Sequence, residues 1–112
     1  MKYFLTNPSA FSGDARGHIL NQIGHMLLIG FLPAFFFPAL APVLLIGYAV
    51  WEYVQFRYYG AKDWDCIEDF GHVFAGVAAA VSTAPLIIIA LSLLWIASGA
   101  LRRIEEANSP CR

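Results

Sequence analysis

Long apolar runs separated by short polar segments dominate this chain. The first run, residues 18–55, holds a single Asp, Glu, Lys or Arg side chain, Glu52. It is too long for one membrane span of about 20 residues, and three prolines interrupt its middle. A second pair of apolar runs, broken by Pro85, follows residue 64. The pattern predicts four helices, at about 15–36, 40–58, 64–83 and 85–104.

The placement of basic residues predicts how these helices cross a membrane. Every Lys and Arg falls before residue 17, between residues 57 and 62, or after residue 101. With four spans these three regions share one face, which the positive-inside rule assigns to the cytoplasm. We therefore expect two helical hairpins with the N- and C-termini in the cytoplasm.

Composition agrees with a lipid environment. Hydrophobic residues make up 59% of the 112 residues and charged residues only 13%, against about 45–50% and about 25% in soluble domains. The expected fold class is therefore an all-α polytopic membrane protein with one integral membrane domain, residues 1–112. The net charge of −1 favours no nucleic-acid partner. The expected partners are membrane lipids and other membrane-protein subunits or a second copy of the chain.

Polar residues recur at helical spacing inside three of the predicted spans. Such side chains are costly at membrane depth, so by default they indicate a functional site. The stripes are Asp65, Asp69, His72 and Gly76 on the third helix, His18, Gln22 and His25 on the first, and Glu52 and Gln55 on the second. At 1.5 Å per residue, His72 lies about 10 Å along its helix from Asp65. All the stripes therefore fall in the cytoplasmic half, at depths where they can meet.

Three chemistries fit these residues. The first is a divalent-metal site built from His18, His25, Asp65, Asp69 and His72, since a carboxylate three residues before a His occurs in helical-bundle metal sites. The second is a paired hydrogen-bonded network, with Glu52 protonated because burial disfavours its charged form. The third is a haem held between His25 and His72, which the nearby carboxylates disfavour. The candidate catalytic residues are Glu52, Asp69 and His72.

Simpler structural roles are expected elsewhere. Asp14 is a candidate N-cap of the first helix, and Asp63 or Asp65 of the third. Glu68 is expected to face headgroups and water, and Trp95 to face lipid. The glycines of the spans are expected to allow close helix packing: Gly24, Gly30, Gly47, Gly71 and Gly76.

Three short motifs resemble those of the VanZ-like family of small bacterial membrane proteins. They are Asp14-Ala-Arg-Gly-His18, Glu52-Tyr-Val-Gln55, and Asp65-Cys-Ile-Glu-Asp69 followed by Gly76. Asp69 stands where the family has Asn, and His72 stands where it commonly has Gly. The resemblance implies a multi-span helical protein of the bacterial cytoplasmic membrane with a role in cell-envelope processes or glycopeptide resistance. It implies no defined reaction.

Three functions remain open from the sequence. One is a small membrane enzyme or metal-binding protein that acts on a lipid-linked or headgroup substrate. Another is an accessory or assembly subunit of a larger membrane complex, one that binds haem or pigment. The last is a pore-forming (holin-like) phage lysis protein, which needs no inward His and carboxylate residues and is ranked last.

Overall fold

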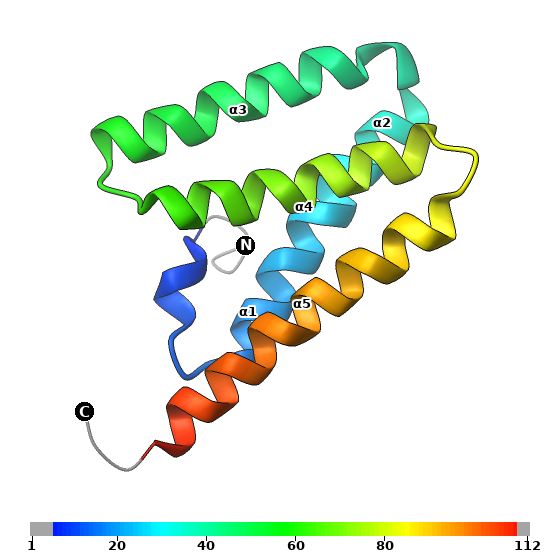
Figure 1. Cartoon of the computed structure of the whole chain (residues 1–112). Helices are drawn as coiled ribbons and strands as arrows, with labels where there is room; N and C mark the ends of the chain where they lie inside the picture. The colour runs from blue at the N-terminus through cyan, green and yellow to red at the C-terminus, as the bar shows by residue number, and fades with distance from the viewer. Residues whose placement is uncertain (1–5, 110–112) are drawn as a thin grey trace.

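The computed structural model describes residues 6–109, and all regular structure in that range is helical. The first element of the described range is a 3₁₀ turn, η2 (Pro8–Phe11). A long helical segment follows, made of α1 (Ala15–Gly24), the π-helical η3 (His25–Phe31) and α2 (Leu32–Phe36). After the short turn η4 (Pro38–Leu40) come α3 (Ala41–Tyr58), α4 (Asp63–Val81) and α5 (Pro85–Asn108) (Figure 1).

Three of these segments are long and apolar enough to cross a membrane: Ala15–Phe36, Pro38–Tyr58 and Pro85–Asn108. The first two agree with predicted helices within two residues at each end, and the third begins at the predicted Pro85. The fourth, α4, begins and ends within two residues of its predicted bounds. It is not among the candidate spans, and it carries four acidic side chains in its first seven residues.

The most polar of these helices lies at the centre of the molecule. α4 contacts η2, α1, η3, α2, α3 and α5. In Figure 1, α3 and α4 run side by side as an antiparallel hairpin, and α5 passes α4 and α1 on the other side. Three of the four acidic side chains of α4, Asp65, Glu68 and Asp69, are therefore buried by protein. This burial accounts for a charged segment within an otherwise apolar chain.

Two glycines set the distance between η3 and α4. A Cβ atom added at Gly76 would meet the carbonyl oxygen of Met26, and one added at Gly30 would meet the carbonyl oxygen of Val73. Close packing was predicted for both positions and is confirmed. The same prediction is wrong for Gly47, where an added Cβ would meet nothing within 4 Å.

The π-helical segment lies just before Pro33, which has no backbone N–H to continue an α-helical ladder. At its end the Leu32 N–H donates to the carbonyl of Leu27, five residues back. This wider winding begins at His25, a candidate site residue. Such π-bulges are frequent at functional sites.

The helix ends follow the predicted signals in part. The Asp14 carboxylate accepts a hydrogen bond from the Gly17 N–H at 2.8 Å, as expected of an N-cap. Gly60, just past α3, has φ of +69°, a conformation that favours glycine. The predicted end of the last helix near residue 104 is wrong, because α5 continues to Asn108.

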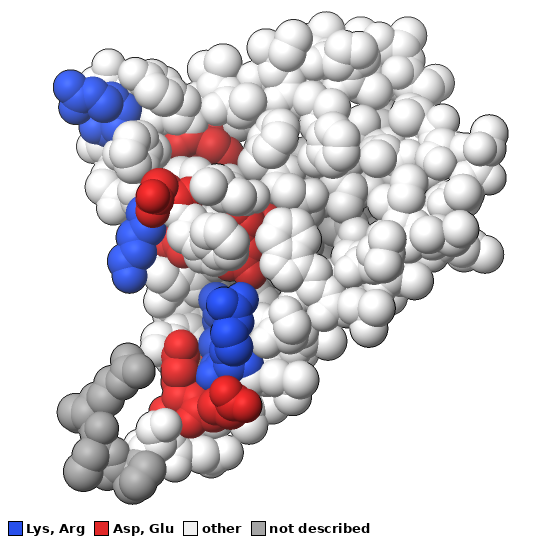
Figure 2. All heavy atoms as spheres, in the orientation of Figure 1, with Lys and Arg blue, Asp and Glu red and all other residues white. Residues whose placement is uncertain are grey.

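Charged side chains gather at one end of the bundle. In Figure 2 the blue and red side chains lie toward the left of the view, and the right of the view is white. That charged end holds η2, the loop between α3 and α4, and the end of α5 (Figure 1). The opposite end has an apolar core of Ala34, Ala41, Tyr48, Val73 and Val77.

Candidate functional site

The half of the bundle next to the charged end has a polar core. Its side chains come from the α1–η3 segment and from α4, and each is at most 4% exposed: His18, Asn21, Gln22, His25, Asp65, Glu68, Asp69 and His72. The end residues of each stripe, His18 and His25 or Asp65 and His72, are seven positions apart, so each stripe stays on one face over about two helical turns. Packing of η3 against α4 brings the two stripes together.

Two histidines of this core each face a carboxylate on α4. The His18 Nε2 lies 3.8 Å from Glu68 Oε1, and the His25 Nε2 lies 3.8 Å from Asp69 Oδ2. Each becomes an ion pair when its imidazole is protonated. The expectation that Glu68 faces headgroups is wrong, since Glu68 is 2% exposed and points at His18.

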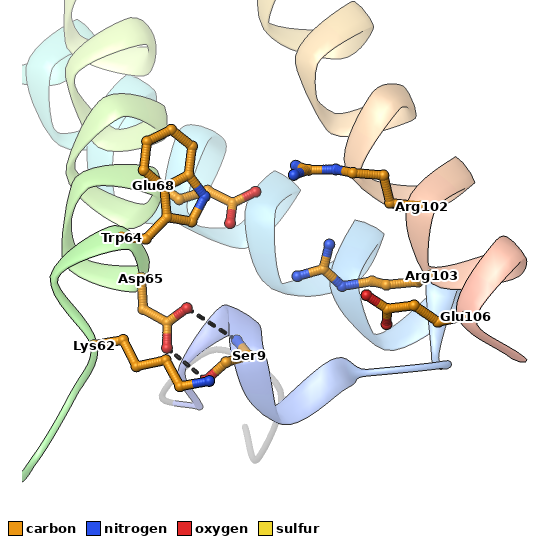
Figure 3. A pocket seen from close by; sticks show the side chains of 8 residues that line it. All are labelled: Ser9, Lys62, Trp64, Asp65, Glu68, Arg102, Arg103 and Glu106. Carbon is orange, nitrogen blue, oxygen red and sulfur yellow. Dashed lines mark hydrogen bonds between the residues drawn. The ribbon is translucent and has the colours of Figure 1, made fainter. Parts of the chain in front are cut away.

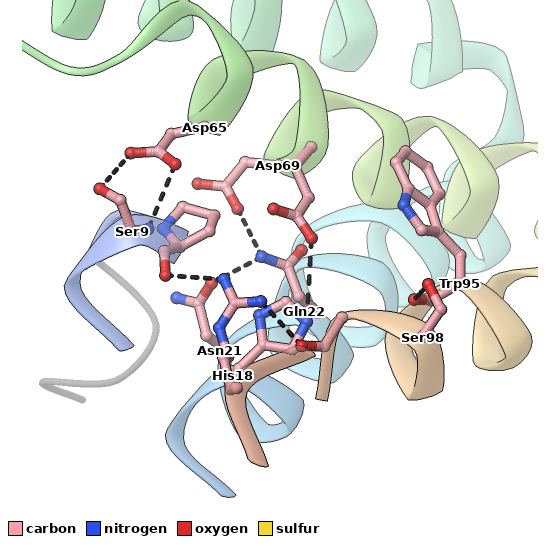
Figure 4. A network of polar contacts seen from close by, with 12 residues as sticks. Ser9, His18, Asn21, Gln22, Asp65, Asp69, Trp95 and Ser98 are labelled. Atoms are coloured by element: carbon pink, nitrogen blue, oxygen red, sulfur yellow. Dashed lines mark hydrogen bonds and ion pairs between the residues drawn. The ribbon is translucent and has the colours of Figure 1, made fainter. Parts of the chain in front are cut away.

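Gln22 joins the core into a network (Figure 4). Its Nε2 donates to Asp69 Oδ1 at 2.9 Å and to Asn21 Oδ1 at 3.0 Å. The Nδ1 of His25 lies 2.9 Å from the Asn21 carbonyl. If Nδ1 carries the proton, Nε2 is left as the base that faces Asp69.

His72 lies apart from these pairs. It is fully buried, and neither ring nitrogen has a hydrogen-bond partner in the described part of the chain. Its ring meets the Trp95 ring edge-on at 4.5 Å between centroids. A purely lipid-facing role for Trp95 is therefore wrong, since this half-buried side chain packs over His72 and Gly71.

The three candidate catalytic residues are all buried, but they are held by different neighbours. Glu52 is 5% exposed, and its backbone carbonyl accepts from the Cys66 thiol at 3.5 Å. In residues 6–109, no hydrogen bond or ion pair joins Glu52, Asp69 and His72 to one another. A shared catalytic role for these three stays a prediction.

The five predicted metal ligands are also divided. Ser9 donates to both oxygens of Asp65 through its N–H and its hydroxyl, so Asp65 holds η2 on α4 instead of capping the helix. His18 faces Glu68, and His25 faces Asp69. Across residues 6–109, no three His, Cys, Asp or Glu side chains form a group suited to a metal ion. The metal site stays a prediction, and no chemistry below depends on it.

α5 contributes residues that the sequence reasoning missed. Gly99 lies against His18, where a Cβ atom would meet the imidazole. Arg103 is 8% exposed and donates to the carbonyls of Gly99 and Pro8 at 3.0 and 2.9 Å. The four-residue spacing of Gly99 and Arg103, which places both on one face of a helix, is the signal for them in the sequence.

Two cavities reach the polar core. One of about 190 Å³ opens between α4 and α5, beside Glu68, with Arg102 and Arg103 among its lining residues (Figure 3). The other is about 30 Å³, roughly the share of one water in the liquid, and its lining includes His25 and Asp69. The first gives Glu68 a route to molecules outside the bundle.

The arrangement is suited to moving protons. A carboxylate paired with an imidazole can take a proton from a bound group and return it, which is general acid–base catalysis. Of this pair, Glu68 is the residue that lines the larger cavity, and His18 does not line it.

Comparison of the chain with family models, with curated proteins and with solved structures gives no match. Its function is therefore argued from its own residues.

Proposed function

We propose that this chain is a four-span protein of the bacterial cytoplasmic membrane that carries out acid–base chemistry on a headgroup or lipid-linked substrate at the cytoplasmic surface. The observation that carries the proposal is the buried Glu68–His18 pair beside the cavity between α4 and α5. Burying a carboxylate and an imidazole at membrane depth costs free energy, so such residues indicate a functional site by default.

The fourth span is supported by the position of α4. Its 19 residues extend about 28 Å, close to the hydrocarbon thickness of about 30 Å. It runs antiparallel to α3, a candidate span, and is enclosed by the other helices. Its acidic side chains therefore need not meet lipid. Four spans put both hairpin turns outside and both chain ends in the cytoplasm.

The chemistry is supported by the order of the residues along the cavity. Glu68 lines the cavity and accepts a proton from a water or hydroxyl bound there. His18 holds the carboxylate from behind and stabilises its charge when protonated. A place in cell-envelope processes comes from the VanZ-like resemblance, whose motif positions include His18, Asp65 and Asp69.

The proposal is tested by lipid conversion in reconstituted vesicles. Purified protein is placed in vesicles that contain phosphatidylglycerol, phosphatidylethanolamine and a polyprenyl pyrophosphate, and the lipids are followed by mass spectrometry. We expect the wild type to convert at least one of them. Glu68→Gln should lower the rate by about 100-fold or more, as loss of an acid–base group does.

Glu105→Gln is the matched control, because Glu105 is an exposed glutamate on α5. It should keep the wild-type rate. His18→Gln should lower the rate while leaving any substrate binding intact. The proposal fails if the wild type converts none of these lipids, or if folded Glu68→Gln protein keeps the full rate.

A further inference from the structure

The cavity between α4 and α5 has an unusual balance of charges. Three cationic and three acidic side chains line it: Lys62, Arg102, Arg103, Asp65, Glu68 and Glu106. By formal charge the lining is neutral. The carboxylates have more hydrogen-bond partners within the protein than the cationic side chains have. This difference decides which ligand the cavity favours.

Two of the three carboxylates are already engaged. Both oxygens of Asp65 accept from Ser9, and Glu106 accepts from the Ser12 hydroxyl and the Gly13 N–H at 2.9 and 3.3 Å. Glu68, the third, faces His18. Neutral donors of the protein therefore already occupy acceptor oxygens of Asp65 and Glu106, and Glu68 faces an imidazole.

The cations keep unused donors. The side chains of Lys62 and Arg102 make no hydrogen bond or ion pair with any described residue. Arg103 uses two of its nitrogens, but its Nε is buried without a partner. Figure 3 shows both guanidinium groups extending from α5 toward α4. An anion with several oxygen acceptors would satisfy these donors together, and phosphate matches the planar guanidinium fork.

The place of the cavity favours a ligand held at the membrane surface. It lies at the charged end of the bundle, beside the start of α4 and the end of α5. The Trp64 side chain on its rim is 53% exposed, and tryptophan is enriched at the headgroup level of membranes.

We infer that this cavity binds a phosphate ester, the headgroup phosphate of a membrane lipid, through Arg102, Arg103 and Lys62. The inference rests on the proposed function and names its substrate class: the phosphate is held by the cations of α5 and the α3–α4 loop, next to Glu68. Arg103 also joins η2 to α5, whereas the Arg102 side chain makes no hydrogen bond or ion pair within residues 6–109, so Arg102 is the arginine to substitute.

The experiment measures binding, separately from conversion. Detergent-purified protein is titrated with short-chain phosphatidic acid, short-chain phosphatidylglycerol, a short-chain diacylglycerol and inorganic phosphate. We expect the two phospholipids to bind and the diacylglycerol, which lacks phosphate, to bind much more weakly. Arg102→Gln should raise the Kd of the phospholipids about ten-fold or more, since a charge-assisted hydrogen bond is lost.

Arg57→Gln is the control, because Arg57 is an exposed arginine at the end of α3 that does not line the cavity. It should leave the Kd unchanged. Inorganic phosphate that binds as tightly as the lipids would support the phosphate site with free phosphate as its ligand. The inference fails if Arg102→Gln binds the phospholipids like the wild type, or if the diacylglycerol binds equally well.

The binding and conversion experiments test the two proposals separately. Glu68→Gln should retain phospholipid binding while losing conversion, whereas Arg102→Gln should lose binding. Binding without any conversion by the wild type would overturn the proposed chemistry and leave the phosphate site standing.

Discussion

At the scale of single residues, Gln22 holds the polar core together. Its amide nitrogen connects Asp69 on α4 with Asn21 on α1, and both contacts are short. Leucine has a similar size but no donor, so its introduction would leave Asp69 Oδ1 buried without this partner. A buried acceptor that loses its donor costs about 1–3 kcal/mol.

We therefore expect Gln22→Leu to lower the free energy of unfolding in detergent by about 1–3 kcal/mol. The measurement is thermal or denaturant unfolding followed by intrinsic fluorescence. Gln55→Leu is the control, because Gln55 is half-buried and its side chain makes no hydrogen bond with the described residues. Equal destabilisation by both variants would show that the Gln22 contacts contribute nothing specific.

At the scale of helices, the contact between η3 and α4 brings the two histidine–carboxylate pairs together. It depends on two glycines that let one backbone approach the other. Gly76 and Gly47 both lie inside helices, so an alanine gains similar helix propensity at either position, about 1 kcal/mol. The two positions differ in the room available for a methyl group. An added Cβ would meet a neighbouring backbone at Gly76 and nothing within 4 Å at Gly47.

Gly76→Ala should therefore lower stability by about 1–3 kcal/mol, the usual cost of overpacking, whereas Gly47→Ala should leave it unchanged or raise it slightly. Melting temperatures of the two variants in the same detergent compare them directly. If Gly76→Ala is as stable as Gly47→Ala, η3 and α4 are not as close as described. Gly76→Ala should also weaken the acid–base chemistry, because it separates Glu68 from His18.

At the scale of the whole molecule, the central question is whether α4 crosses the membrane. Its buried carboxylates and its place among apolar helices favour a span, although its composition alone does not. The two ends of α4 then lie on opposite sides of the membrane. If α4 instead lay at the surface, both ends would be on the same side.

Single cysteines at Tyr59 and Thr83, two exposed positions that flank α4, distinguish these arrangements. In a chain with Cys66→Ser and Cys111→Ser, a membrane-impermeant maleimide added to intact spheroplasts should label Tyr59→Cys poorly and Thr83→Cys well. Lysis should then expose Tyr59→Cys. Labelling of both positions from the same side would contradict the four-span topology.

Much of the fold follows from hydrophobicity. The long apolar runs, the prolines and Asp14 locate the helices, because these signals act within a few residues of the chain. The later end of α5 was missed, since residues 105–108 contain neither glycine nor proline to end the helix. The folding of η2 onto α4 was also missed, because it depends on Ser9 meeting Asp65, 56 residues away.

The sequence by itself determined which residues share one face of a helix and how far apart they lie along its axis, since both follow from helical spacing. The tertiary structure decided their partners: Glu68 turned inward to His18, Asp69 to His25 and Gln22, and Arg102 and Arg103 beside a cavity. These pairings depend on how each helix is rotated about its axis and how closely it packs. That rotation is set by contacts between distant residues, such as Gly30 and Gly76 with the facing backbone, which spacing along one helix does not contain.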